Sequence, residues 1–173
     1  MATAVALVAL PAGAAEVEGE PQQEAHDDHG GHHHVVGLKG SYMAGFSHGE
    51  VHHLGGGGFF LETSVIHHWL ELELGVRALA NAHDLAFPID LLVKMPFYAS
   101  DVVHPFIGAG PTIVLGFEEG VGTAFHAGGA FTAGTYIWPW TWGGFVVEAN
   151  YNLISHDGLA HEIGPNVGFA VRW

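Results

Sequence analysis

The residues of this sequence with the clearest capacity for chemistry are its histidines. There are 15 among 173 residues, and five of them fall in or near one acidic run, HDDHGGHHH. Neutral imidazole beside carboxylate is a ligand set for Zn, Cu or Ni. We expect metal capture chiefly at His26, His29, His32, His33 and His34, with a weaker set at His48, His52, His53, His156 and His161.

Two other interpretations of the histidines stay open, a solvated polar tail and a pH-responsive coat. The spacing of the run fixes no coordination geometry, although the run is flexible enough to wrap an ion. Because an unperturbed imidazole has a pKa near 6.5, the 15 histidines would add roughly +14 by pH 5, about cancelling the formal charge of −14.

A second group of chemistry-bearing residues is charged and recurs at every second position of apolar segments. In the stretch WLELELGVR, from Trp69 to Arg77, acids and an arginine alternate with Leu and Val. This period of two is typical of a strand with two unlike faces. The charged face is too sparse to be a solvated surface, so we expect the apolar face to meet lipid and the charged face to line an interior.

All four cations of the sequence fall on this interior phase, together with five acids. A register slip of one residue would turn Arg77 and Lys94 toward acyl chains, at a cost of about 2 to 4 kcal/mol each near the midplane. We therefore predict a lumenal network of ion pairs formed by Lys39, Glu62, Glu71, Glu73, Arg77, Asp90, Lys94, Glu148 and Arg172.

The elements that position these residues are predicted to be strands. The 26 Gly and only 4 Lys+Arg are unlike a typical soluble enzyme, and no run of 18 apolar residues exists to form a membrane helix. Eight segments are long enough for tilted membrane strands, at Val35–Phe46, Gly57–Ile66, Trp69–Leu79, Leu85–Phe97, Val103–Phe117, Thr123–Trp138, Thr141–Leu153 and Ala160–Trp173.

The links between these segments alternate in length and polarity. The longer and more polar links are residues 47–56, 80–84, 118–122 and 154–161, while most of the others are tight. Long loops on one side and short turns on the other are typical of bacterial outer-membrane barrels. We expect the short-turn side, which also carries the N-terminal tail, to face the periplasm.

The N-terminal region is predicted to lie outside the folded domain. Residues 1–15 have the apolar core and small-residue end of a signal peptide. Residues 16–34 form an acidic, His-rich tail that lacks periodicity and cannot bury enough surface to fold, so we expect it to be disordered. The barrel domain is then residues 35–173, and it contains no Cys for a disulfide or a thiolate site.

The tryptophans all fall at one predicted rim, that of the short turns. They are Trp69, Trp138, Trp140, Trp142 and Trp173. Indole prefers the headgroup level of a membrane, where its ring and its N–H are both satisfied. A soluble β-sandwich is the alternative, but it would not place every Trp at one end.

The eight segments, the phrase PFIGAGP at Pro105–Pro111 and the ending NVGFAVRW resemble the small outer-membrane β-barrels of the OmpA and OmpX kind. The resemblance implies an all-β, eight-stranded antiparallel up-and-down transmembrane β-barrel, monomeric, in contact with outer-membrane lipid. In that family the barrel-assembly machinery recognises a final strand that alternates to a C-terminal aromatic residue. Here Val167, Phe169, Val171 and Trp173 keep that phase, with Trp in place of the usual Phe.

The function we expect is non-enzymatic, a structural or interaction role in the Gram-negative envelope, with divalent metal as a candidate ligand. Serine adjoins histidine at Ser47–His48 and at Ser155–His156, but neighbours in a strand point to opposite faces. No dinucleotide fingerprint or basic patch is present, so we expect no nucleic-acid partner. The alternative is a lipid-modifying barrel enzyme with an unrecognised site, as some eight-stranded barrels of this membrane are.

Overall fold

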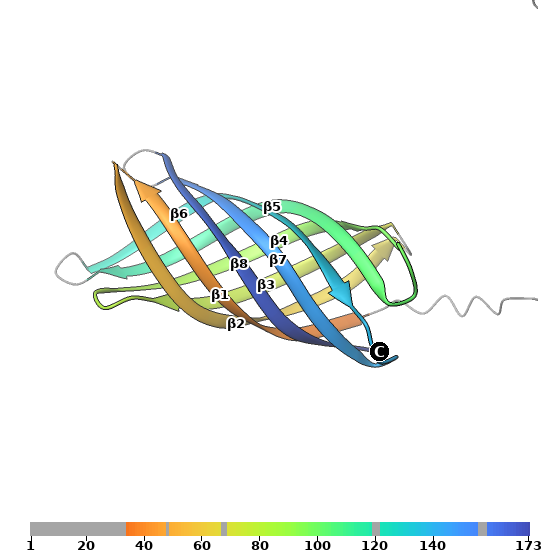
Figure 1. The fold of residues 1–173 in the computed structure, drawn as a ribbon. Coiled ribbons are helices and arrows are strands. Elements are labelled where there is room, and N and C mark those ends of the chain that lie inside the picture. Colours follow the sequence, from red (N-terminus) through yellow and green to blue (C-terminus); the bar gives the residue numbers. More distant parts are fainter. Residues whose placement is uncertain (1–33, 48, 67–68, 119–121, 156–158) are drawn as a thin grey trace, which may run out of the picture.

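The structure, a computed structural model, describes residues 34–47, 49–66, 69–118, 122–155 and 159–173. Eight strands account for most of these residues (Figure 1), namely β1 His34–Ser47, β2 Glu50–Ile66, β3 Leu70–Ala80, β4 Asp84–Pro96, β5 Val103–Glu118, β6 Gly122–Ile137, β7 Gly143–Ser155 and β8 Leu159–Arg172. No helix in the described ranges is long and apolar enough to cross a membrane. The predicted signal peptide and nearly all of the predicted tail lie outside these ranges.

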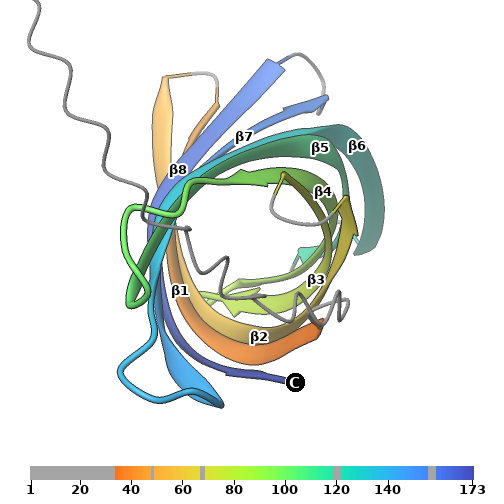
Figure 2. The same cartoon turned by 90° about the vertical axis from the view of Figure 1, so that its right-hand side faces the viewer.

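The strands form one closed antiparallel barrel. Each strand pairs with the next, and β8 pairs back onto β1 from Val35 opposite Arg172 to Phe46 opposite His161. The ring of strands is visible in Figure 2. Closure removes the free edges that an open sheet would expose. The predicted eight-stranded up-and-down topology is confirmed.

Both ends of the folded chain meet at one end of the barrel, which we name the terminal end. His34 and Trp173 exchange two backbone hydrogen bonds of 3.2 Å there. The links 97–102 and 138–142 lie at the same end. β1, β3, β5 and β7 end, and β2, β4, β6 and β8 begin, at the opposite end, which we name the hairpin end. His34 belongs to β1, so the barrel begins one residue before the predicted boundary.

The predicted long links at the hairpin end are wrong where the structure describes them. β2 begins at Glu50 rather than at Gly57, and the residues between them pair with β1. Gly49 has a φ of 83°, which favours a tight turn directly before β2. The link 81–83 at the hairpin end is also shorter than the link 97–102 at the terminal end.

Glycine explains why this part of β2 remains a strand. A Cβ on Gly56 would lie 1.9 Å from the carbonyl oxygen of Ala78, and one on Gly58 would lie 2.1 Å from that of Val76. Gly56 and Gly58 therefore permit a close approach of β3 that no other residue type allows. The sequence prediction assigns residues 47–56 to a loop because this segment is polar.

The strands alternate between an apolar outer face and a charged inner face. On β3, Glu73 is 3% exposed and its neighbour Leu74 is 44% exposed; on β1, Lys39 is 7% exposed and Leu38 is 69% exposed. The apolar side chains thus point away from the barrel and the charged ones point into it. This confirms the predicted strand phase.

Four of the five tryptophans are exposed at the terminal end, as predicted. They are Trp69, Trp140, Trp142 and Trp173. Trp138 differs, because it continues the inward phase of β6 and is 5% exposed, stacked on Tyr136 at 5.2 Å between ring centroids. Its indole fills the terminal end of the lumen instead of facing outward.

Candidate functional site

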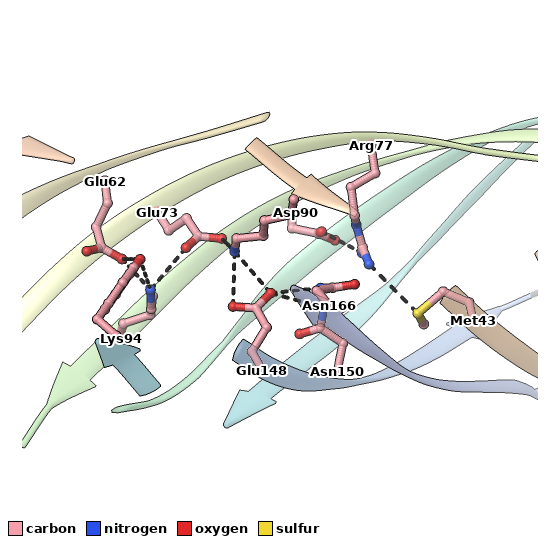
Figure 3. Close-up of polar contacts among 11 residues, drawn as sticks. Met43, Glu62, Glu73, Arg77, Asp90, Lys94, Glu148, Asn150 and Asn166 are labelled. Atoms are coloured by element: carbon pink, nitrogen blue, oxygen red, sulfur yellow. Dashed lines mark hydrogen bonds and ion pairs between the residues drawn. The ribbon is translucent and has the colours of Figure 1, made fainter. Parts of the chain in front are cut away.

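Buried charges fill the middle of the barrel and form what we name the lumenal network. It consists of Lys39, Glu62, Glu73, Arg77, Asp90, Lys94 and Glu148, all of which are buried. These residues come from β1, β2, β3, β4 and β7, and each lies at an inward position of its strand. Figure 3 shows most of their contacts.

Lys94 lies at the centre of one half of the network and is 0% exposed. Its Nζ donates to Glu62 Oε2, to Glu73 Oε2 at 3.0 Å and to the Tyr136 hydroxyl at 3.0 Å. The Tyr136 hydroxyl in turn donates to Glu62 Oε2 at 3.0 Å. The ammonium group thus has three oxygen partners, which match its three N–H donors.

Glu73 connects Lys94 to Lys39. Its Oε1 accepts from Lys39 Nζ at 2.9 Å. Its Oε2 accepts from Lys94 Nζ (Figure 3). Lys39 also donates to both carboxylate oxygens of Glu148 at 3.0 Å. The amides of Asn150 and Asn166 donate to Glu148 Oε1 at 3.3 and 2.8 Å. Every charge in this chain of contacts has a partner of opposite sign, which buried ions require.

Arg77 and Asp90 form a second cluster closer to the hairpin end. Arg77 donates to Asp90 Oδ2 at 2.7 Å, and the Thr112 hydroxyl donates to Asp90 Oδ1 at 2.6 Å. The guanidinium also approaches the Met43 sulfur at 3.9 Å. Arg77 Nε has no hydrogen-bond partner among the described protein groups, which is typical of a donor that meets water.

Aromatic rings pack against the two lysines of the network. Lys39 Nζ lies 4.2 Å from the ring centroid of Phe60, and Lys94 Nζ lies 3.8 Å from that of Phe106. These rings and Tyr136 belong to one buried apolar cluster that continues to Trp138. The cluster surrounds the lysines with apolar atoms, and the low local dielectric strengthens their ion pairs.

Little free space remains around the network. A cavity of about 10 Å³ lies among Lys39, Arg77, Asp90, Asn152 and other inward residues, which is room for about one water. Wider cavities open at the two mouths, about 360 Å³ at the hairpin end and about 310 Å³ at the terminal end. The middle of the lumen is therefore filled by side chains, with one cavity at each end, as expected for eight strands.

Two other predicted members lie at the terminal edge of the network, where Glu71 shares a side-chain hydrogen bond with Glu62. Arg172 points inward but is only partly buried, and it donates to the Thr141 carbonyl at 2.9 Å and stacks over Trp138 at 4.5 Å. Glu71 lies opposite Lys94 in the register and lines the cavity at the terminal end with Arg172. In the link 97–102, burial and then the nearby Glu71 charge raise the pKa of Tyr98 to about 12.

The sequence prediction missed the neutral partners of the network. Thr112, Tyr136, Asn150 and Asn166 are all buried and each bonds a carboxylate. The signal that could have found them is their phase, because each lies at an inward position of its strand like the charged residues. A search of the inward positions for charged residues alone overlooks these neutral polar side chains.

The predicted metal ligands are not brought together in the described part of the chain. His52 lies 3.7 Å from Glu50 and lines the hairpin-end cavity, whereas His53 and His161 lie on the outer face. Within the described ranges no group of three or more His, Cys, Asp or Glu side chains could hold a metal ion. His26, His29, His32, His33, His48 and His156 lie outside the described residues.

Comparison with known proteins relates this chain to small outer-membrane barrels through its fold. No protein family and no curated protein matches the sequence. Among solved structures, Neisserial surface protein A has a TM-score of 0.69 at 13% identity, over 80% of this chain and 96% of that chain. The N-terminal barrel of Pseudomonas aeruginosa OprF has a TM-score of 0.62 at 12% identity, over 80% and 97%. The attachment invasion locus protein Ail of Yersinia pestis has a TM-score of 0.56 at 13% identity, over 82% and 99%. The predicted resemblance to eight-stranded outer-membrane barrels is thus confirmed at the level of the fold.

Proposed function

We propose that this protein is a non-enzymatic interaction protein of the bacterial outer membrane. The observation that carries the proposal is the filled lumen, in which buried ion pairs and aromatic rings occupy the space a pore would need. The apolar outer face and the exposed Trp at the terminal end support insertion in a bilayer. Interactions with partners would then take place at the two ends of the barrel, on its outer face and in the N-terminal tail.

The terminal end is proposed to face the periplasm. Both ends of the folded chain meet there, because His34 at the start of β1 is hydrogen-bonded to Trp173. In this orientation β8 presents Phe169, Val171 and Trp173 as the aromatic C-terminal phase that the barrel-assembly machinery would read. The barrel would act as a monomer, because its closed sheet offers no strand edge to a second copy.

Capture of Zn, Cu or Ni by the N-terminal histidines is part of this proposal. It is supported by the density of His26, His29, His32, His33 and His34 beside acidic residues in the sequence. In the proposed orientation these residues would meet metal in the periplasm. The hairpin-end histidines contribute little, since His52 and His53 lie on opposite faces of β2.

Conductance and lipid hydrolysis test the proposed function together. We expect refolded protein in planar phosphatidylcholine bilayers to give no steady channels, and labelled phospholipid or lipid A to stay intact after incubation with it. Steady single-channel steps would contradict the filled lumen. A purified outer-membrane phospholipase is the positive control for hydrolysis. Hydrolysis by the refolded protein in the same assay would instead favour a lipid-modifying enzyme.

A further inference from the structure

Among the described side chains on the outer face of the barrel, histidine is the only basic group. Among the described side chains of the strands, Lys39, Arg77, Lys94 and Arg172 all lie at inward positions, and so do the acids. His34, His53 and His161 lie at outward positions. His34 is at the terminal end beside Trp173, at 5.9 Å between ring centroids. The other two lie toward the hairpin end, where no permanent cation on the described outer face could meet an anionic lipid.

His53 and His161 are each held by a tyrosine of the neighbouring strand. The Tyr42 hydroxyl lies 2.7 Å from His53 Nδ1, and the Tyr151 hydroxyl lies 2.6 Å from His161 Nδ1. The rings of these pairs lie 5.8 and 6.0 Å apart. In both pairs the histidine is diagonal to the tyrosine across one antiparallel pairing, β1 with β2 and β7 with β8. The same Tyr–His arrangement thus occurs twice, on four strands that are contiguous in the barrel.

Each Tyr–His pair retains one unused donor. A tyrosine and a neutral histidine together have one O–H and one N–H. The contact between the hydroxyl and Nδ1 uses one of these hydrogens, whichever group donates it. The other hydrogen, on Nε2 or on the hydroxyl, stays available to an oxygen atom outside the barrel. Protonation of the imidazole would add a second donor and a positive charge.

The two pairs lie at the height where a second membrane interface is expected. Ala44, which is opposite His53, follows His34 by ten residues on β1, from 34 to 44. At about 3.3 Å per residue and a tilt near 40°, this separation is roughly 25 Å along the barrel axis. The apolar band of outer-membrane barrels is about 25 Å tall. The exposed Trp of the terminal end and the two Tyr–His pairs therefore flank one membrane thickness.

We propose that the Tyr42–His53 and Tyr151–His161 pairs form a belt that binds the phosphate groups of anionic lipid in the leaflet at the hairpin end. The available donors match phosphate oxygens, which lie at this depth of a bilayer. The inference rests on the proposed membrane location and adds a lipid-binding site to it. His161 and His53 are separated by β1 alone, so both pairs can serve one headgroup region.

The belt binds anionic lipid more strongly at acidic pH. The outward neighbours of His53 are Tyr42 and Phe46 on β1 and Val51 on β2, and β3 presents Ala80 to this side. His161 is flanked by Tyr151 and Leu153 on β7, Phe46 on β1, and Leu159 and Ile163 on β8. None of these neighbours is charged, and Glu50 and Glu162 point into the hairpin-end cavity instead. Protonation therefore places a positive charge at the lipid surface with no described acid beside it.

Spin-labelled lipid measures the preference directly. The full-length protein is refolded into phosphatidylcholine bilayers with a trace of spin-labelled phosphatidylglycerol or phosphatidylcholine, and the relative association of the two with the protein is measured at pH 7.5 and 5.0. Phosphatidylglycerol keeps its charge over this range, so a change reports the protein. We expect the preference for phosphatidylglycerol to rise by up to about fivefold at pH 5.0, the scale of a surface ion pair.

Three variants give the comparison its specificity. His53→Gln with His161→Gln replaces both imidazoles of the belt by neutral amides and should remove most of the rise. Tyr42→Phe with Tyr151→Phe keeps the imidazoles but removes the hydroxyls that hold them in position, and should leave a smaller rise. His34→Gln, at the other rim, is the matched control and should keep most of the rise because it removes no residue of the belt.

A rise that persists in the double His→Gln variant, or that disappears equally in His34→Gln, overturns the belt. Heat-modifiable migration of every sample separates this failure from that of the proposed function. If wild-type protein migrates as an inserted barrel but shows no lipid preference at either pH, only the belt is wrong. If it does not insert at all, the membrane location and the belt fail together.

Discussion

Lys94 shows how much a single residue contributes to this barrel. Its ammonium group is fully buried and binds Glu62, Glu73 and Tyr136 at once. Removal of the cation leaves two carboxylates without their shared partner, and an uncompensated buried charge costs several kcal/mol. The neutral group beside it, the Tyr136 hydroxyl, is a hydrogen-bond donor to Glu62 but cannot replace a positive charge.

We predict that Lys94→Met lowers the free energy of unfolding by about 3 to 5 kcal/mol. Urea titration of folded barrel in lipid vesicles, followed by heat-modifiable migration, measures the change. Arg172→Met is the matched control, because Arg172 is only partly buried and its partner is a backbone carbonyl. Equal effects of the two substitutions would show that burial in the network does not matter.

Trp138 and Trp142 give a second comparison at this scale. Trp138 is 5% exposed inside the lumen, whereas Trp142 is 56% exposed on the outer face. Trp138→Ala should cost about 3 to 5 kcal/mol through the cavity that it leaves in the apolar cluster. Trp142→Ala should cost less, since lipid can fill the vacated space. A larger loss for Trp142→Ala in the same urea titration would contradict the inward position of Trp138.

At the scale of the strands, glycine decides where neighbouring backbones can approach. A Cβ on Gly164 of β8 would lie 1.7 Å from the Tyr42 carbonyl oxygen of β1, the contact that closes the barrel. Gly45 of β1 also lies at an inward position, but a Cβ there would meet nothing closer than 3.8 Å. We predict that Gly164→Ala sharply lowers the yield of heat-modifiable barrel and that Gly45→Ala does not. Normal folding of Gly164→Ala would mean that the strands need no such approach.

The sequence predicts a strand well where its side chains differ between the lipid face and the lumenal face. It predicts a strand poorly where close approach of the backbones determines the residue type. The period of two in β3 places Glu73 and Leu74 on their correct faces, because lipid and lumen demand opposite chemistry. The start of β2 was missed because Glu50, His52 and His53 have the polarity of a loop, and because Gly55 and Gly56 have no side chains to show a phase. Trp138 was assigned to the rim with the other tryptophans beside the Pro139 turn, although its even number continues the inward phase of β6 and places it inside.

For the candidate site, the sequence predicts which charged residues point into the lumen but not which of them form ion pairs with each other. Which residues point inward follows from strand phase, whereas which oxygen each lysine meets depends on the stagger between strands. Thus Lys39 on β1 meets Glu148 on β7, two strands away around the closed barrel. No local pattern in the sequence contains that contact.

At the scale of the whole molecule, the N-terminal histidines provide a test of metal capture. We predict that calorimetry detects micromolar or weaker binding of Zn, Cu or Ni at pH 7.5 that fades at pH 5.0, because protons compete for the imidazole nitrogens. Replacement of the tail set by Gln should remove most of this binding; the set is His26, His29, His32, His33 and His34.

The control for that measurement replaces His52, His53 and His161 by Gln and should retain the binding. Equal losses in the two variants would show that the tail is not the principal site. Absence of binding in the wild-type protein at both pH values would leave the histidines as a solvated or pH-sensitive coat, and the metal proposal would be dropped.

The central claim is that the apolar face of this barrel meets lipid while the charged face is sealed inside. The sequence contains no Cys, so single spin labels can be attached at introduced cysteines along β3, from Leu70 to Leu79. In bilayers, we predict that labels at Leu72, Leu74 and Val76 are accessible to oxygen and protected from a water-soluble nickel chelate. Labels at the alternating positions Glu73 and Gly75 should be protected from both reagents. Accessibility to the nickel chelate without a period of two would contradict the account.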